Sequence, residues 1–241
     1  MLDLDEDVSQ RLQSWRIPAN NGWYPRVTLR QLLSHTAGMT VGGFVGYPEG
    51  VPVPSVPDLL AGHGNSMPVV VAGMPGLRHS YSGGGYVVMQ QLLVDVTGQD
   101  FPTLAEELVL APTGMRDSTF AQPLPARLAT NAAAGHHPGP VLVPGRWHTY
   151  PEMAAAGLWT TAGDLTRFFL AIRASLSDEA GALLPQHLAE QMAGAAKPHV
   201  PYGLGLQLAA ASEPSAIGHV GNTQGSRTGP SSTPARGRAS W

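Results

Sequence analysis

The 241-residue chain has no cysteine, a single lysine and few charged residues. Without cysteine it can form no disulfide bond, no thiolate nucleophile and no cysteine-ligated metal site. Asp, Glu, Lys and Arg make up only 13% of the chain, and the net charge is -3. This charge predicts neither nucleic acid nor an anionic membrane as a partner. No apolar run reaches the roughly 18 residues of a membrane span, and the acidic N-terminus is unlike a signal peptide.

Glycine and proline are abundant, with 29 and 22 residues, and they predict many turns. Apolar residues make up 43% of the chain, which suffices for one large domain or two small ones. A strand is expected from Tyr202 to Leu208, and a disordered tail over residues 225–241, where no apolar period remains. Helices and strand together favour an α+β or mixed fold. Apolar periodicity predicts helices at Val8 to Trp15, after Thr28, from Tyr86 to Gly98, after Asp100, after Thr161 and from Gln186 to Met192.

The segment Leu77 to Tyr86 (LRHSYSGGGY) places Tyr81 at a glycine-rich corner in front of a predicted helix. Glycines allow close backbone approach, and a helix behind such a corner holds it rigid. This arrangement suits a phenol that must meet a substrate. A buried core tyrosine beside a turn is the alternative that the local pattern leaves open.

Five further segments accompany this corner in a fixed order. They are Val27 to Gly38 (VTLRQLLSHTAG), Leu110 to Phe120 (LAPTGMRDSTF), Ala156 to Leu165 (AGLWTTAGDL), Tyr202 to Gly205 (YGLG) and Gly218 to Asn222 (GHVGN). Together they resemble the serine β-lactamase and penicillin-binding-protein superfamily, in its class C and esterase-like branch. The resemblance implies an α+β, β-lactamase/transpeptidase-like fold, with a helical region plus an antiparallel sheet with flanking helices. It covers residues 1–224 as a partial domain.

The resemblance also assigns roles to individual residues. Tyr81 matches the tyrosine that shuttles a proton to the leaving group, and His219 matches a cationic position on a strand beside the site. Gly221 lets substrate backbone lie against that strand, and the Asn222 amide matches an oxyanion donor. Gly83 stands where the family usually has an asparagine. For His219, an ordinary surface histidine is the alternative.

The family nucleophile is a serine in a Ser-x-x-Lys sequence, which puts serine and lysine on one helix face. The only lysine, Lys197, has Gly194 three residues before it, so this motif does not occur in the 241 residues. By the resemblance, the nucleophile helix would precede Met1, and closing strands and a helix would follow Gly225. We therefore expect a member of a serine hydrolase family that is inactive with these 241 residues alone. A non-catalytic binding protein, a partner-dependent protein and a gene fragment without function are the alternatives.

Several histidines need a separate interpretation. His35 directly follows Ser34, but adjacent helical residues point about 100° apart, so we interpret His35 as structural rather than as half of a dyad. His136, His137 and His148 have neither metal-ligand spacing nor a nearby carboxylate, so neither a metal nor a cofactor is expected. The expected partner is a small-molecule or peptide substrate with a carbonyl. Relatives are often periplasmic or secreted, and the cellular location of this chain is left open.

Overall fold

The computed structural model describes residues 2–198, 200–209 and 216–234. The chain forms two compact units, each described below by itself. The first comprises Met1–Leu104, Phe120–Leu158 and Asn222–Arg227, and the second comprises Ala105–Thr119, Trp159–Gly221 and Thr228–Trp241. Among the described residues, no helix combines the length and apolarity that a membrane crossing requires.

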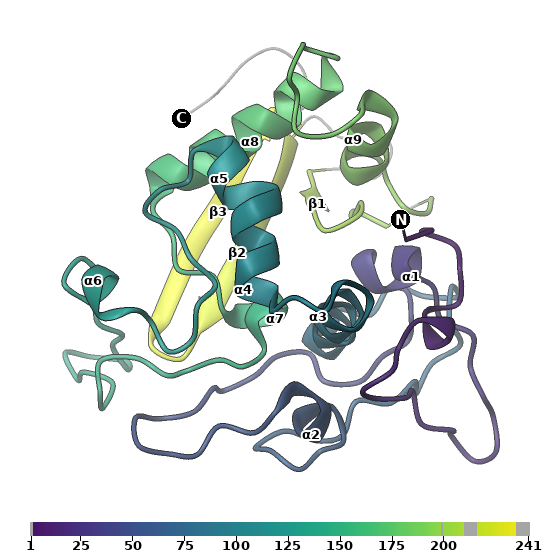
Figure 1. Ribbon diagram of the computed structural model, residues 1–241, viewed down its shortest axis with the longest axis horizontal. Helices are drawn as coiled ribbons and strands as arrows, with labels where there is room; N and C mark the ends of the chain where they lie inside the picture. Colours follow the sequence, from purple (N-terminus) through teal and green to yellow (C-terminus); the bar gives the residue numbers. More distant parts are fainter. Residues whose placement is uncertain (1, 199, 210–215, 235–241) are drawn as a thin grey trace. The chain divides into compact units, whose positions relative to one another are not determined.

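The helix α3 (Gly83–Thr97) is the centre of the first unit. It begins at the N-cap Ser82 and ends at the C-cap Gly98. The φ of Gly98 is 70°, which lies in the left-handed region that favours glycine. The predicted end of this helix is therefore confirmed. Figure 1 shows α1 and α2 beside α3. The helices of this unit are η1 (Val8–Gln10), α1 (Leu29–Leu33), α2 (Val56–Leu60), α3, α6 (Ala126–Ala129) and α7 (Met153–Ala156), with α4 (Phe101–Ala105) at its boundary.

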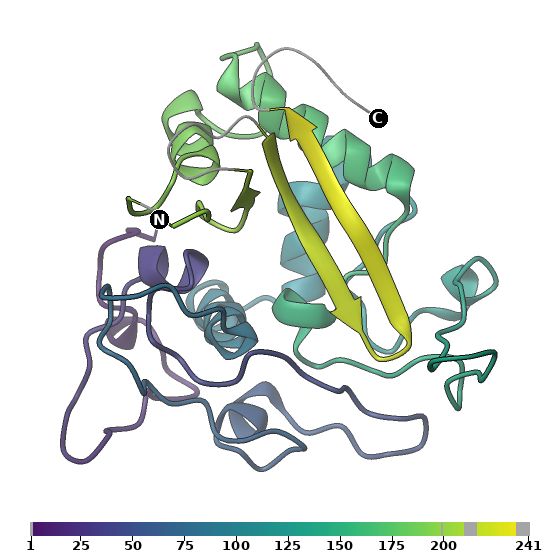
Figure 2. The same cartoon turned by 180° about the vertical axis from the view of Figure 1, so that it is seen from behind.

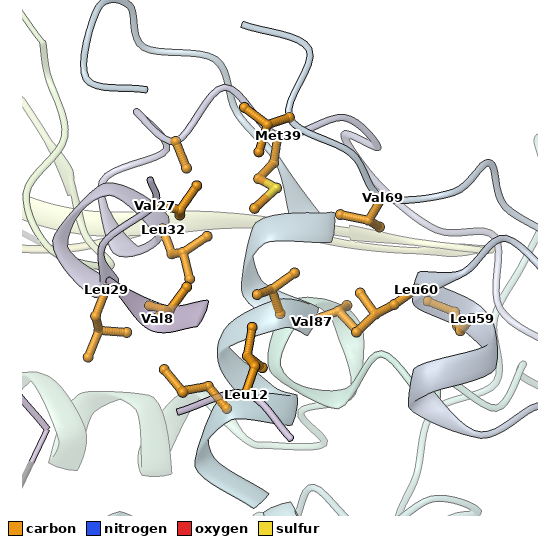
Figure 3. Packing of buried hydrophobic residues seen from close by; sticks show 14 of the residues in the cluster. Val8, Leu12, Val27, Leu29, Leu32, Met39, Leu59, Leu60, Val69 and Val87 are labelled. Atoms are coloured by element: carbon orange, nitrogen blue, oxygen red, sulfur yellow. The ribbon is translucent and has the colours of Figure 1, made fainter. Parts of the chain in front are cut away.

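Apolar side chains from α1, α2, α3 and the segments between them form the core of the first unit, as Figure 3 shows. Leu32 from α1, Leu60 from α2 and Val87 from α3 are almost completely buried. Met39 and Val69, which lie in the irregular segment between α1 and α3, pack into the same cluster. The glycine- and proline-rich segment is thus anchored to the core at intervals by single apolar residues.

The N-terminal elements confirm one local prediction and correct another. Thr28 and Gln31 form the predicted capping box at the start of α1, because each side chain accepts a hydrogen bond from the other residue's backbone N–H. The helix expected from Val8 to Trp15 is only the single turn η1. Val8 and Leu12 are nevertheless buried in the core. Their spacing therefore indicated the buried residues correctly, although no long helix forms.

The second unit is built around α8 (Ala162–Leu176), which begins at Thr161 as predicted. Phe169 and Ile172 of α8 pack with Leu206 and Ile217 in a second core cluster. The completely buried Asp164 accepts hydrogen bonds from the Asp117 N–H, the Ser118 hydroxyl and Arg167, so its charge is compensated. The other helices of this unit are η2 (Glu106–Leu110), α5 (Ala111–Thr113) and α9 (Gln186–Ala193).

The sheet has the order β1 (Gln207–Leu208), β2 (Ala216–Thr223) and β3 (Ser226–Pro234). The strand β1 pairs antiparallel with β2, with Gln207 opposite Gly218 and Leu208 opposite Ile217. The strand expected from Tyr202 to Leu208 is thus limited to its last two residues.

The strand β3 corrects the prediction of a disordered tail for residues 226–234, whereas 235–241 lie outside the described residues. Figure 2 shows β2 and β3 as a hairpin in yellow. The hairpin turns at Gly225, whose φ of 73° favours glycine. The prediction was wrong because it relied on composition, which indicates only how much apolar side-chain surface a segment can bury. A hairpin partner satisfies backbone N–H and C=O groups whether or not the side chains alternate.

Candidate functional site

Tyr81 lies directly before the N-cap of α3. The Ser82 hydroxyl accepts a hydrogen bond from the Gly85 N–H at 3.0 Å and donates one to the Thr40 carbonyl at 2.7 Å. These contacts fix the backbone on the C-terminal side of Tyr81 to both the helix and the preceding loop. The Tyr81 side chain itself is 44% exposed. Tyr81 is therefore an accessible phenol on a rigid corner and not the buried core residue that the sequence left open.

His35 supports the Tyr81 corner through hydrogen bonds to its backbone and a contact with the Tyr81 ring. Its carbonyl accepts a hydrogen bond from the Ser80 N–H at 2.8 Å, and its ring Nδ1 accepts one from the Ser82 N–H at 3.1 Å. The imidazole also stacks against the Tyr81 ring, with centroids 4.1 Å apart, and against Tyr86 at 4.9 Å. One residue thus holds the backbone on both sides of Tyr81 and one face of its ring. His35 is structural, as the sequence analysis proposed, and what it structures is the candidate site.

The Tyr81 hydroxyl is protonated near neutral pH. Partial burial raises the pKa of the Tyr81 phenol above its ordinary value of 10.0. Burial also lowers the pKa of His79, which favours its neutral form. The ring of His79 meets that of His35 edge-on, with centroids 5.9 Å apart. Tyr81 is accordingly a proton donor at rest, and it could accept a proton only after losing its own.

Replacing His35 with leucine should destabilise the chain by about 2 kcal/mol, because it leaves the buried Ser82 N–H without its acceptor. Amide hydrogen exchange at Ser82 should also become faster. Urea unfolding measures the loss of stability, and NMR measures the exchange rate. The matched control is His63→Leu, since His63 is 72% exposed. Equal stability of the two variants would argue against the support that we assign to His35.

A side chain at the Gly83 position would press tightly against its neighbours. A Cβ atom there would lie 3.1 Å from the Phe44 ring and 3.2 Å from the Gly42 carbonyl oxygen. An asparagine at this position would require Phe44 to move. The departure from the family pattern at Gly83 is thus matched by the packing of Phe44 over it.

His219 lies in β2 and has a partner at each ring nitrogen. Nδ1 is 2.8 Å from the Val220 carbonyl oxygen, and Nε2 is 2.9 Å from the hydroxyl of Tyr202. Burial lowers the pKa of His219, and the hydrogen bond to Val220 opposes this effect. The structure therefore favours a neutral imidazole where the sequence predicted a cationic position.

The remaining predicted residues follow in the same strand. Gly221 is half-buried and Asn222 is exposed, both within β2. Tyr81 and Gly83 belong to the first unit, whereas His219 and Gly221 belong to the second. The structure brings Tyr81 together with His35, and His219 together with Tyr202. The roles that the resemblance assigns to Tyr81 and His219 stay predictions.

The sequence analysis missed Glu152, a buried carboxyl in the first unit. Its side chain is completely buried, and neither carboxyl oxygen bonds to another residue in the described part of the chain. Burial raises the pKa of Glu152 to about 7, against a weaker opposing effect of its own backbone N–H. The charge of Glu152 adds to burial in raising the pKa values of Tyr47 and Tyr150. A signal was present, because Glu152 is the only charge between Tyr150 and Trp159.

The histidines of residues 121–151 do not assemble a metal site. Within the described ranges, no group of three or more His, Asp or Glu side chains could hold a metal ion. His136 and His148 instead contact the backbone carbonyls of Ala134 and Val45.

Comparisons with known proteins place the chain. The Beta-lactamase family model matches residues 1–235. Esterase EstB of Burkholderia gladioli is 27% identical over 265 residues, which cover 92% of this chain and 65% of the esterase. The chain therefore belongs to the Beta-lactamase family, and it spans about two thirds of the length of this relative.

Solved structures show the same fold. The D-stereospecific amidohydrolase from a Streptomyces species superimposes with a TM-score of 0.69 at 21% identity, covering 97% of this chain and 72% of that one. The octameric penicillin-binding-protein homologue from Pyrococcus abyssi gives 0.65 at 22% identity, covering 92% and 51%. The fold is thus the α+β fold of β-lactamases and penicillin-binding proteins, as the resemblance predicted.

Proposed function

We propose that the chain carries part of an acyl-transfer site for an ester, amide or β-lactam carbonyl. The observation that carries the proposal is the rigid corner that presents the protonated Tyr81 phenol, in a chain whose family includes an esterase. In this proposal Tyr81 gives a proton to the leaving group, and the Asn222 N–H stabilises the oxyanion. Gly221 leaves room for the substrate against β2.

The proposal includes no attacking serine within the 241 residues. An acyl-enzyme forms only when a base activates the serine oxygen, and no serine here has a lysine one helical turn away. Ser82, the serine next to Tyr81, is only 3% exposed. Its hydroxyl already caps α3 and donates to the Thr40 carbonyl. Ser82 is therefore committed to the structure of the corner and is a poor nucleophile candidate.

We expect the purified chain to show no hydrolysis of a short-chain nitrophenyl ester or a chromogenic β-lactam above background. A fluorophosphonate probe should label no serine stoichiometrically, because covalent catalysis requires an activated oxygen. Mass spectrometry of the intact protein measures the labelling, and absorbance measures the turnover. Stoichiometric labelling of one serine that tracks turnover would overturn the absence of a nucleophile.

The role of Tyr81 has a separate test in an active form of the site. We expect that joining the chain to a segment with the family Ser-x-x-Lys motif and the closing strands restores hydrolysis. Tyr81→Phe should then lower kcat by about 100-fold or more, the usual range for general acid–base catalysis. Tyr24→Phe is the matched control, because Tyr24 is 81% exposed. A folded but inert extended protein would favour binding over catalysis.

A further inference from the structure

The two hydrogen bonds of His219 determine which of its nitrogens carries a proton. A backbone carbonyl oxygen can only accept a hydrogen bond, so the 2.8 Å contact with Val220 requires a proton on Nδ1. In a neutral imidazole the other nitrogen is then an acceptor. The contact of 2.9 Å between Nε2 and the Tyr202 hydroxyl therefore has the phenol as donor. The ring planes lie 88° apart, so Tyr202 meets the imidazole edge-on.

The segment around Tyr202 is held firmly in place. Its side chain is only 3% exposed. Its carbonyl accepts a hydrogen bond from the Ala196 N–H at 2.9 Å, and it forms a bridge with Gln207 at the start of β1. The following residue must be glycine, because a Cβ on Gly203 would overlap the Met192 carbonyl of α9. The segment is thus fixed between α9 and β1.

We propose that Tyr202 is a positioning residue that holds the neutral imidazole of His219 in the tautomer with its proton on Nδ1. The neutral ring then offers no positive charge beside β2 to an anionic group of a substrate. The inference deepens the proposed function and rests on it for this functional meaning. A cationic histidine would instead donate from both ring nitrogens, with the Val220 carbonyl oxygen and the Tyr202 oxygen as the acceptors. The burial of His219, which lowers its pKa, supports the neutral form.

The protonation state can be measured directly, without any hydrolysis assay. Long-range correlation of imidazole protons with their nitrogens in the 15N-labelled full chain distinguishes the two neutral tautomers and the cation. The signals of His219 are identified by their loss in His219→Gln. At pH 7 we expect a protonated Nδ1 and an unprotonated Nε2. A protonated Nε2, in either the other tautomer or the cation, would overturn the proposal.

The variant Tyr202→Phe tests the part of the proposal that concerns the tyrosine. Loss of the phenol donor should shift the Nε2 resonance of the neutral ring, because the hydrogen bond to Nε2 is lost. Tyr150→Phe is the matched control, because Tyr150 is also buried but lies in the other unit. An unchanged Nε2 resonance in a folded Tyr202→Phe protein would contradict the assignment. If this variant does not fold, the tautomer measured in the unmodified chain still tests the proposal.

The spectroscopic result and the proposed function can fail independently. The tautomer of His219 is a property of the second unit, whereas acyl transfer depends on a nucleophile and on Tyr81. A neutral Nδ1–H tautomer in a protein that never hydrolyses an acyl compound leaves the positioning role intact and removes its catalytic meaning. Hydrolysis by an extended protein in which His219 is cationic would support the proposed function and overturn the positioning role of Tyr202.

Discussion

The free energy of unfolding should fall by about 3 kcal/mol between pH 4.5 and about 8 through the ionisation of Glu152. The pKa of this carboxyl is about 7 in the folded chain, compared with 4.5 for an ordinary glutamate. Between these values the folded state binds more protons than the unfolded state, so stability decreases as the pH rises. Above about pH 8 the carboxyl is ionised in both states, and the decrease ends.

Other groups titrate in the same range, so the comparison with Glu152→Gln isolates this effect. Urea unfolding at a series of pH values gives the difference in stability between the unmodified chain and the variant. That difference should change by about 3 kcal/mol across the range, because glutamine cannot ionise. The control is Glu106→Gln, which removes an exposed carboxylate of η2. A difference that stays constant with pH would show that Glu152 is ionised in the folded chain or finds a partner there.

The second large effect concerns two adjacent glycines at the start of α3. A Cβ on Gly84 would lie 2.7 Å from the Thr40 carbonyl oxygen and 3.0 Å from a methyl group of Val69. A Cβ on Gly85 would be 3.5 Å from its nearest neighbour, Leu32, which is ordinary contact. The same substitution by alanine should therefore have opposite consequences at the two positions.

Gly84→Ala should destabilise the chain by about 3 kcal/mol, because the obstacle is backbone that cannot rotate away. Gly85→Ala should stabilise it by about 0.5 kcal/mol, since alanine loses less backbone entropy than glycine in a helix. Chemical denaturation of both variants measures the contrast, and Gly85→Ala serves as the matched control. Similar changes in both variants would mean that the loop around Thr40 yields easily. Because that loop also holds Ser82, Gly84→Ala should loosen the Tyr81 corner as well.

Local features of the fold could be predicted from the sequence because short-range rules decide them. The capping box of Thr28 and Gln31, the Gly98 end of α3 and the Thr161 start of α8 each depend on residues within one helical turn. The family and its α+β fold also followed from the sequence, because six motifs occur in a fixed order. The tail could not be predicted in this way, because β3 depends on a partner strand rather than on its own apolar pattern.

The sequence by itself determined which residues are candidates, and the tertiary structure decided their states. Tyr81, His219 and the missing Ser-x-x-Lys motif can be read from order and spacing alone. The hold of His35 on the Tyr81 corner joins residues 47 positions apart. The contact of Tyr202 with His219 spans 17 positions, and the burial of Glu152 arises from packing around it. Protonation depends on solvation and on hydrogen-bond partners, and both are set by segments that meet only when the chain folds.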